Sequence, residues 1–90
     1  MQLGETEKAD VLERLKKVEG QVRGIQRMID ADRYCVDVLT QVAAARAALY
    51  KVGLTVLEGH TRGCVTSAIR SGQGDAAVEE LVAVLMKFSG

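Results

Sequence analysis

The sequence is poor in several residue types, and each shortage narrows the possible structures. It has no proline and no tryptophan, and its aromatic side chains are Tyr34, Tyr50 and Phe88. Without proline, no position forces a helix to break. No apolar run approaches the ~20 residues of a membrane span, and the polar N-terminus does not resemble a signal peptide. We therefore expect a cytoplasmic protein with no membrane partner.

The chain is also short and electrically balanced. Its 90 residues allow one domain, spanning residues 1–90, and a chain of this size has a marginal hydrophobic core of its own. Twelve basic and twelve acidic residues give a formal net charge of zero, which is weak evidence for a polyanionic partner of a monomer. The apolar residues are mainly aliphatic, which favours helix-on-helix packing. Oligomerisation is expected to supply the missing burial.

Apolar residues recur with the period of amphipathic helices. Spacings of 4, 3, 4, 3, 4 predict a first helix over about residues 6–30, with the seam Val11, Leu15, Val18, Val22, Ile25 and Ile29. The same rhythm predicts a second helix over about 34–70, with the seam Val38, Val42, Ala45, Leu49, Val52 and Val56. A third helix is expected over about 75–88, and Asp32 is expected to be the N-cap of the second helix. The fold class is therefore all-α, with a three-helix protomer.

The second helix is much longer than its neighbours. An average helix has about 11–12 residues, so a helix of this length needs a partner along much of its length. Its own chain offers only two shorter helices. We therefore predict that two copies of the second helix pair antiparallel, which gives a helical-bundle homodimer with two equivalent halves.

The chain's one histidine and its two cysteines fall into a single pattern. His60 and Cys64 are four residues apart, so on a helix they share one face within reach of one small ion. Cys35 is far upstream in the same helix, roughly 37 Å away at about 1.5 Å per residue. The three side chains can form one site only between two chains. Antiparallel pairing brings the Cys35 end of one chain beside the His60–Cys64 end of the other.

Two thiolates and one imidazole make a soft, three-ligand set. Soft sulfur ligands select Cu(I), Zn(II) or iron–sulfur clusters. The chain has no spare cysteine or histidine for a closed zinc site, and a cluster needs more thiolates. Three-coordinate Cu(I), one ion per chain, fits best, although Asp, Glu or water could complete a Zn(II) site. No convergent acid–base set accompanies these residues, so we expect no enzyme and no small-molecule substrate.

Two other interpretations of these side chains stay open. The thiols could act without metal, as an oxidation or sulfur-transfer switch that joins Cys35 to Cys64 of another chain. The cysteines and His60 could also be ordinary structural residues of a helical assembly protein that binds no ligand. A dithiol switch has no need of a histidine, so His60 favours the metal.

The first helix carries a row of basic side chains on its polar side: Arg14, Lys16, Lys17, Arg23 and Arg27. Pairing with neighbouring acids such as Glu13 and Glu19 would make this an ordinary solvated face. No helix-turn-helix or zinc-finger signature is present. A tetramer would repeat the basic cluster four times, and phosphate contacts gain strength from such repetition.

Several segments of the chain resemble the copper-sensitive operon repressor family (CsoR/RcnR type) of bacterial transcription regulators. The resemblance covers nearly the whole length. It rests on LERLK at 12–16, GQV at 20–22, GI at 24–25, YCVDV at 34–38, QVAAA at 41–45, His60, Cys64 and AVEEL at 77–81.

The resemblance implies an all-helical protomer, an antiparallel dimer and a dimer-of-dimers tetramer. It implies that the metal-free tetramer binds operator DNA and represses metal-efflux genes, typically that of a copper-transporting ATPase. Cu(I) binding by Cys35 of one chain with His60 and Cys64 of its partner is expected to release the DNA. Tyr34 and Glu80 occupy the positions that link the histidine to the third helix in this family.

The resemblance also assigns a DNA-binding region and separates this chain from sibling sensors. The residues that match the DNA-binding region are Arg14, Lys16, Lys17 and Lys51. Nickel and cobalt siblings recruit an extra N-terminal ligand, usually histidine, where this chain has Met1, Gln2 and Leu3. Persulfide sensors lack the histidine and formaldehyde sensors lack the second cysteine. The comparison favours copper, with thiol-based sensing as the alternative within the family.

Overall fold

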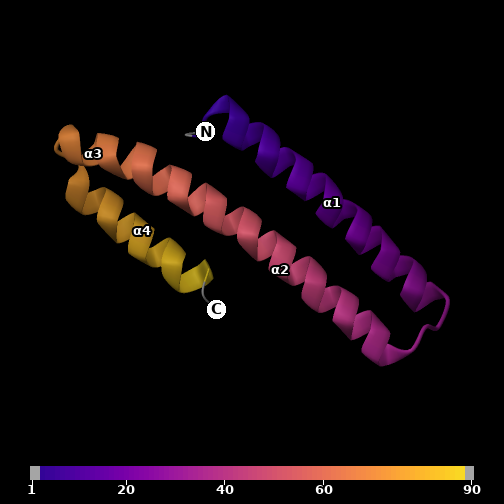
Figure 1. Ribbon diagram of the computed structural model, residues 1–90. Helices are drawn as coiled ribbons and strands as arrows, with labels where there is room; N and C mark the ends of the chain where they lie inside the picture. Colours follow the sequence, from indigo (N-terminus) through magenta and orange to yellow (C-terminus); the bar gives the residue numbers. More distant parts are fainter. Residues whose placement is uncertain (1–2, 89–90) are drawn as a thin grey trace. The chain divides into compact units, whose positions relative to one another are not determined.

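The computed structural model describes residues 3–88, which form helices and turns without a strand (Figure 1). The elements are α1 (Glu5–Asp30), α2 (Cys35–His60), a π-helical turn η1 (Thr61–Val65), α3 (Thr66–Arg70) and α4 (Gly74–Phe88). Met1 and Gln2, on which part of the comparison with nickel and cobalt sensors depends, lie outside the described residues. In the described range, no helix combines the length and apolar character needed to cross a membrane.

These elements confirm the predicted all-α protomer. α1 and α4 match the first and third predicted helices to within one residue at their ends. α2, η1 and α3 follow one another without a break from residue 35 to residue 70, so the long second helix is confirmed in extent. The sequence analysis did not anticipate the π-helical turn inside it.

The expectation that Asp32 caps the second helix is wrong. Asp32 instead has a left-handed φ of 53° and lies just after the end of α1. There the N–H of Asp32 donates to the carbonyl of Ile29 (3.1 Å), and the N–H of Arg33 donates to that of Met28 (2.9 Å). This is the Schellman arrangement, which satisfies the last free carbonyls of a helix. The short polar side chain of Asp suits an N-cap, and Asp also tolerates the left-handed region better than most residues.

The chain divides into two compact units, of which the first comprises residues 4–55. It holds α1 and most of α2, joined through residues 31–34 as a helical hairpin (Figure 1). Its buried apolar residues are Val11 and Val18 on α1 and Ala45 and Val52 on α2. The members of each pair are seven residues apart, and two helical turns return a side chain to the same face. The hairpin therefore uses only part of each predicted seam as its core.

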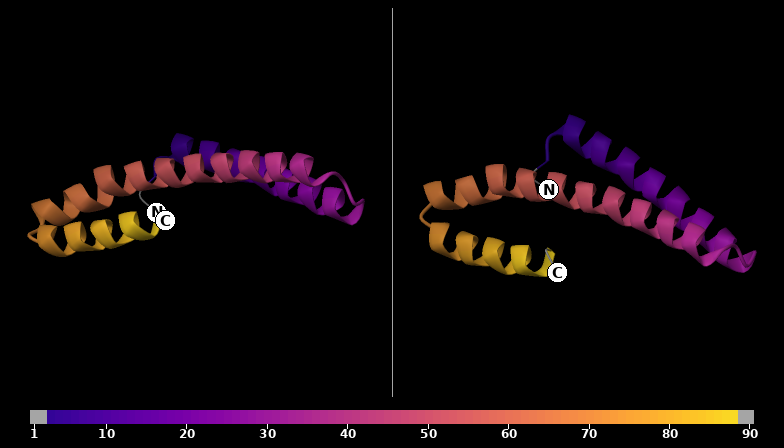
Figure 2. Two further views of the ribbon diagram at one scale, coloured as in Figure 1. Left: turned by 90° about the horizontal axis from the view of Figure 1, so that it is seen from below. Right: turned by 60° about the horizontal axis from the view of Figure 1, so that its bottom comes forward.

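Among the described residues, the second unit contains Leu3 and residues 56–88. Within it, α4 turns back along η1 and α3 and contacts both (Figure 2). The reversal uses a second Schellman arrangement, with Gly72 at φ +85° and the N–H of Gln73 donating to the carbonyl of Ala68 (2.7 Å). Val65 is the buried apolar residue of this unit.

Much of the apolar surface stays exposed in a single chain. Val22 and Ile29 of the first seam and Leu49 of the second are exposed, and so are Val82 and Met86 on α4. Met86 reaches 74% exposure. Val22 and Ile29 are seven residues apart on α1 and so share one face of the helix, and an exposed apolar face is typical of contact with another protein surface.

Two glycines with open space around them should respond oppositely to alanine. Gly72→Ala forces a side chain into the left-handed region, so we expect it to lower the free energy of unfolding by about 1–2 kcal/mol. Gly20→Ala, inside α1, should raise it by about 0.5–1 kcal/mol, because alanine favours helix. Chemical denaturation followed by circular dichroism measures both. A Gly72→Ala protein as stable as the parent would contradict the turn geometry.

Candidate metal site and basic surface

The first predicted ligand, Cys35, lies in the unit of residues 4–55. It is the first residue of α2, and its side chain is exposed and in no disulfide. Tyr34 immediately precedes it and is 69% exposed. The carbonyl of Tyr34 accepts the N–H groups of Asp37 (3.0 Å) and Val38 (3.2 Å), which fixes the start of the helix directly before the thiol.

The other two predicted ligands lie together in the second unit. His60 is the last residue of α2 and Cys64 is the fourth residue of η1, so they are four positions apart on continuous helical backbone. Both side chains are half-buried, and the Cys64 thiol is free. Within residues 3–88 of one chain, no three His, Cys, Asp or Glu side chains converge as a group able to hold a metal ion. One chain thus presents a pair of soft donors and a separate third donor.

The π-helical turn that carries Cys64 is the feature that sequence reasoning missed. A π turn closes hydrogen bonds from residue i to i+5, is rare, and occurs frequently at functional sites. Two threonine hydroxyls bond to the backbone here. Thr61 donates to the carbonyl of Leu57 (2.9 Å), and Thr66 donates to the carbonyl of Thr61 (3.4 Å). The available signal was the low helix propensity of Gly59 and Gly63, which reduced the expected continuity of the helix without locating the turn.

Glu80, the predicted link between the histidine and the last helix, lies on α4 with an exposed side chain. It belongs to the same unit as His60 and Cys64. The turn that carries Cys64 and the helix that carries Glu80 are in contact, because α4 packs against η1.

The four predicted DNA-binding residues all lie in the unit of residues 4–55, on two sides of α1 and on α2. Arg14 and Lys17 line one hollow together with Asp10, Glu13, Gln21 and Ala48. Arg14 Nε is 2.9 Å from Asp10 Oδ2, an ion pair across one turn that the sequence analysis did not single out. Lys51 is exposed on α2.

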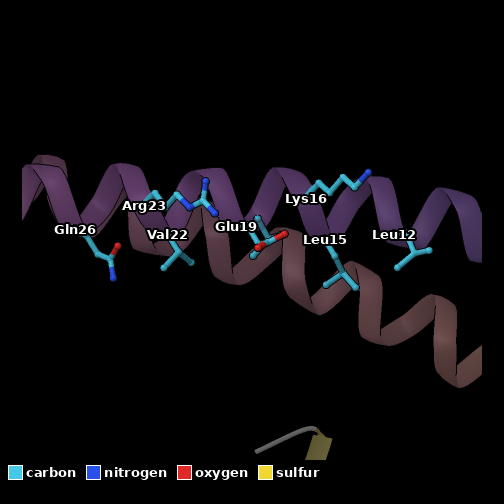
Figure 3. A pocket seen from close by; sticks show the side chains of 8 residues that line it. Leu12, Leu15, Lys16, Glu19, Val22, Arg23 and Gln26 are labelled. Atoms are coloured by element: carbon cyan, nitrogen blue, oxygen red, sulfur yellow. The ribbon is translucent and has the colours of Figure 1, made fainter.

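Lys16 belongs to a different surface of α1, which we call the α1 groove. The groove has a volume of about 690 Å³, and its lining residues are Leu12, Leu15, Lys16, Val18, Glu19, Val22, Arg23 and Gln26. Figure 3 shows Leu12, Leu15 and Val22 along one side of the helix, with Lys16 and Arg23 at the edge. An apolar strip edged by charges of both signs is typical of a surface that another protein chain covers.

Comparison with known proteins places this architecture among regulators of transcription. A family model described as "Metal-sensitive transcriptional repressor" matches residues 7–87. The copper-sensing transcriptional repressor CsoR of Bacillus subtilis is 52% identical over 83 residues, which cover 92% of this chain and 82% of that protein. The copper-sensing transcriptional repressor RicR of Mycobacterium tuberculosis is 52% identical over 66 residues, or 73% of this chain and 69% of its own.

Solved structures show the same similarity in three dimensions. The crystal structure of the copper-sensing repressor CsoR with Cu(I) from Geobacillus thermodenitrificans matches with a TM-score of 0.91 and 42% identity, over 100% of this chain and 94% of that one. The nickel-responsive transcriptional regulator InrS matches with a TM-score of 0.77 and 34% identity, over 98% of this chain and 96% of its own.

Proposed function

Because this chain belongs to the family of metal-sensitive transcriptional repressors, we propose that it is a Cu(I)-responsive repressor. In this proposal the metal-free protein binds operator DNA in the cytoplasm and leaves it when Cu(I) binds, which allows transcription of copper-efflux genes. The observation that carries the proposal is the donor set, two free thiols and one imidazole, with no further cysteine or histidine in the chain. The similarity to copper-sensing relatives supports the same inducer.

The residues present fit Cu(I). Cys35, His60 and Cys64 would hold the ion, because thiolate and imidazole are ligands that Cu(I) prefers and three donors satisfy it. Cu(I), when bound, supplies a bridge between donors that are otherwise unconnected. Both thiols are free, and the two ion pairs described for residues 3–88, Arg14–Asp10 and Arg62–Glu58, involve none of the three donors.

The site would be completed by a second chain, with Cys35 from one protomer and His60 and Cys64 from the other. The helical separation calculated from the sequence supports this division. So does the lack of a three-residue metal group within residues 3–88 of one chain. An antiparallel homodimer has two such sites, and the exposed apolar residues of the α1 groove and of α4 offer surface for the dimer and for a dimer-of-dimers tetramer.

DNA binding would use the basic residues of the first unit, namely Arg14, Lys16, Lys17 and Lys51. The chain as a whole has no net positive charge, so affinity for phosphate must come from a local cluster repeated by the assembly. The ion pair between Arg14 and Asp10 is exposed, and exposed pairs contribute only about 0–1 kcal/mol. Arg14 can therefore exchange Asp10 for a DNA phosphate at small cost.

The two activities would be coupled through the second unit. His60 and Cys64 stand at a turn that contacts α4, the helix of Glu80. Drawing the Cys35 end of one chain to this turn in its partner favours one arrangement of the dimer, and DNA favours another. Coupling between two binding sites is typically about 1–3 kcal/mol, or a 5–150-fold change in affinity.

Each alternative inducer would give this protein a different response to added ligands. The likeness to a nickel-responsive regulator makes Ni(II) a competitor to test, and Zn(II) completed by a carboxylate is another. A thiol-based sensor would respond to a persulfide donor or to formaldehyde and not to Cu(I). A ligand-free assembly protein would neither take up Cu(I) in a 1:1 ratio to chains nor bind a DNA fragment carrying its own promoter.

The division of the site between chains can be tested by complementation. Cys35→Ala and Cys64→Ala proteins should each lose tight Cu(I) binding. Mixed dimers made from the two variants should recover one intact site per dimer, because one pairing keeps all three donors. Competition with a Cu(I) chelator measures the recovered stoichiometry. No recovery in mixed dimers, checked by mass spectrometry to have formed, would contradict an inter-chain site.

Removing the imidazole should separate Cu(I) binding from release of DNA. His60→Ala retains both thiols, so we expect it to keep much of its Cu(I) affinity. It should lose most of the Cu(I)-induced decrease in DNA affinity, because His60 is the donor that we expect to link the metal to Glu80 on α4. Fluorescence anisotropy with a promoter fragment, with and without Cu(I), measures this coupling. A variant that still leaves DNA normally on adding Cu(I) would overturn the role of His60.

The basic cluster should be visible in the salt dependence of DNA binding. Lys17→Ala and Lys51→Ala should weaken binding, and each lost phosphate contact should lower the slope of log affinity against log salt concentration by about 1. Lys87→Ala on α4 makes the same change of charge outside the proposed surface and serves as the matched control. Equal effects from all three variants would mean that net charge, and not this surface, governs binding.

A further inference from the structure

Threonine hydroxyls bond to helix carbonyls at four places in the chain, and one of these bonds differs in register. Thr40 donates to Val36, Thr55 to Lys51 and Thr61 to Leu57, each four residues back, at 2.8–3.1 Å. Thr66 donates to the carbonyl of Thr61, five residues back, at 3.4 Å. The odd bond spans the π-helical turn of residues 61–65.

The register of this turn decides how His60 and Cys64 face each other. In an α-helix a residue and its fourth neighbour share a face, because a turn takes 3.6 residues. A π turn takes more residues, so the same spacing leaves Cys64 at a different angle from His60. The choice between α and π backbone therefore changes the relative direction of the two donors without changing the sequence between them.

Two threonines, Thr61 at the first position of the turn and Thr66 directly after it, act on the same backbone. The hydroxyl of Thr61 bonds to the carbonyl of Leu57, and a threonine bond of this kind competes with the helix ladder and bends the helix. The carbonyl of Thr61 in turn accepts the hydroxyl of Thr66. Thr40 and Thr55 also bond to the carbonyl four residues back, but within regular α-helix, so this bond alone does not produce a π turn. The π turn differs from these two places by the bond from the Thr66 hydroxyl to the carbonyl of Thr61.

We propose that Thr66, together with Thr61, is a positioning residue for the metal site: it holds residues 61–65 in π register and thereby sets Cys64 relative to His60. This inference rests on the proposed function for the identity of the ligand, Cu(I). Its structural part does not, because the π register and the bond from Thr66 involve only residues of this chain. All the groups involved lie within the unit of residues 56–88.

The metal-free protein provides the first test. Thr66→Val removes the hydroxyl with little change of shape, Thr66→Ser keeps it, and Thr55→Val removes an equivalent hydroxyl from regular α-helix. NMR-detected amide hydrogen exchange and carbonyl chemical shifts report the register of residues 61–66. We expect Thr66→Val to change these signals around the turn, Thr66→Ser to preserve them, and Thr55→Val to leave the turn untouched. A turn that keeps its signals in Thr66→Val overturns the proposal.

Cu(I) binding provides the second test. Loss of one hydrogen bond should lower the affinity of Thr66→Val for Cu(I) roughly three- to tenfold. The ¹⁵N signals of the His60 ring should shift less on adding Cu(I) than in the parent, and Thr66→Ser should restore both properties. Equal losses in Thr55→Val, or no rescue by Thr66→Ser, would refute a positioning role. Failure of the parent protein to bind Cu(I) would instead reject the proposed function and leave the result on the metal-free turn standing.

Discussion

A single chain cannot bury the apolar stripes of its own helices, and the remaining properties of the protein follow from this constraint. Its buried apolar side chains are Val11, Val18, Ala45, Val52 and Val65, all small or β-branched. Larger apolar residues, such as Leu39 on α2 and Met86 on α4, remain exposed. A chain of 90 residues has little interior to offer, so a partner surface must supply the missing burial.

The same shortage of interior explains why the metal donors are shared between chains in our proposal. In that proposal α2 supplies the dimer surface, and its length also separates its first residue, Cys35, from its last, His60. Binding to a site built between chains depends on how those chains are assembled. Binding there stabilises one arrangement of protomers over another, which is what a regulator of DNA binding requires. A closed site within one protomer would have a much weaker influence on quaternary structure.

The proposed basic surface belongs to a chain whose formal net charge is zero. Acidic residues stand beside the basic ones on α1, as Asp10 does beside Arg14. Such pairing suppresses nonspecific attraction to polyanions and costs little to break at an exposed site. In the proposed function, affinity for DNA would depend on how many copies of the cluster the assembly presents in register, so quaternary rearrangement would be an effective means of control.

The sequence by itself determined the helices and suggested the donor set. Periodic apolar residues and the lack of proline were sufficient to place the helical segments within about a residue, and the rarity of Cys and His led to the prediction that Cys35, His60 and Cys64 are the donors. Only the tertiary structure decided three other features: the π register at 61–65, the left-handed Asp32 at the end of α1, and the seam residues that the hairpin buries. The reason is physical. Side-chain periodicity shows which face of a helix is apolar. It does not determine a one-residue change in hydrogen-bond register, a helix cap, or which apolar neighbours are buried. These features depend on small energy differences that the packing of the folded chain decides.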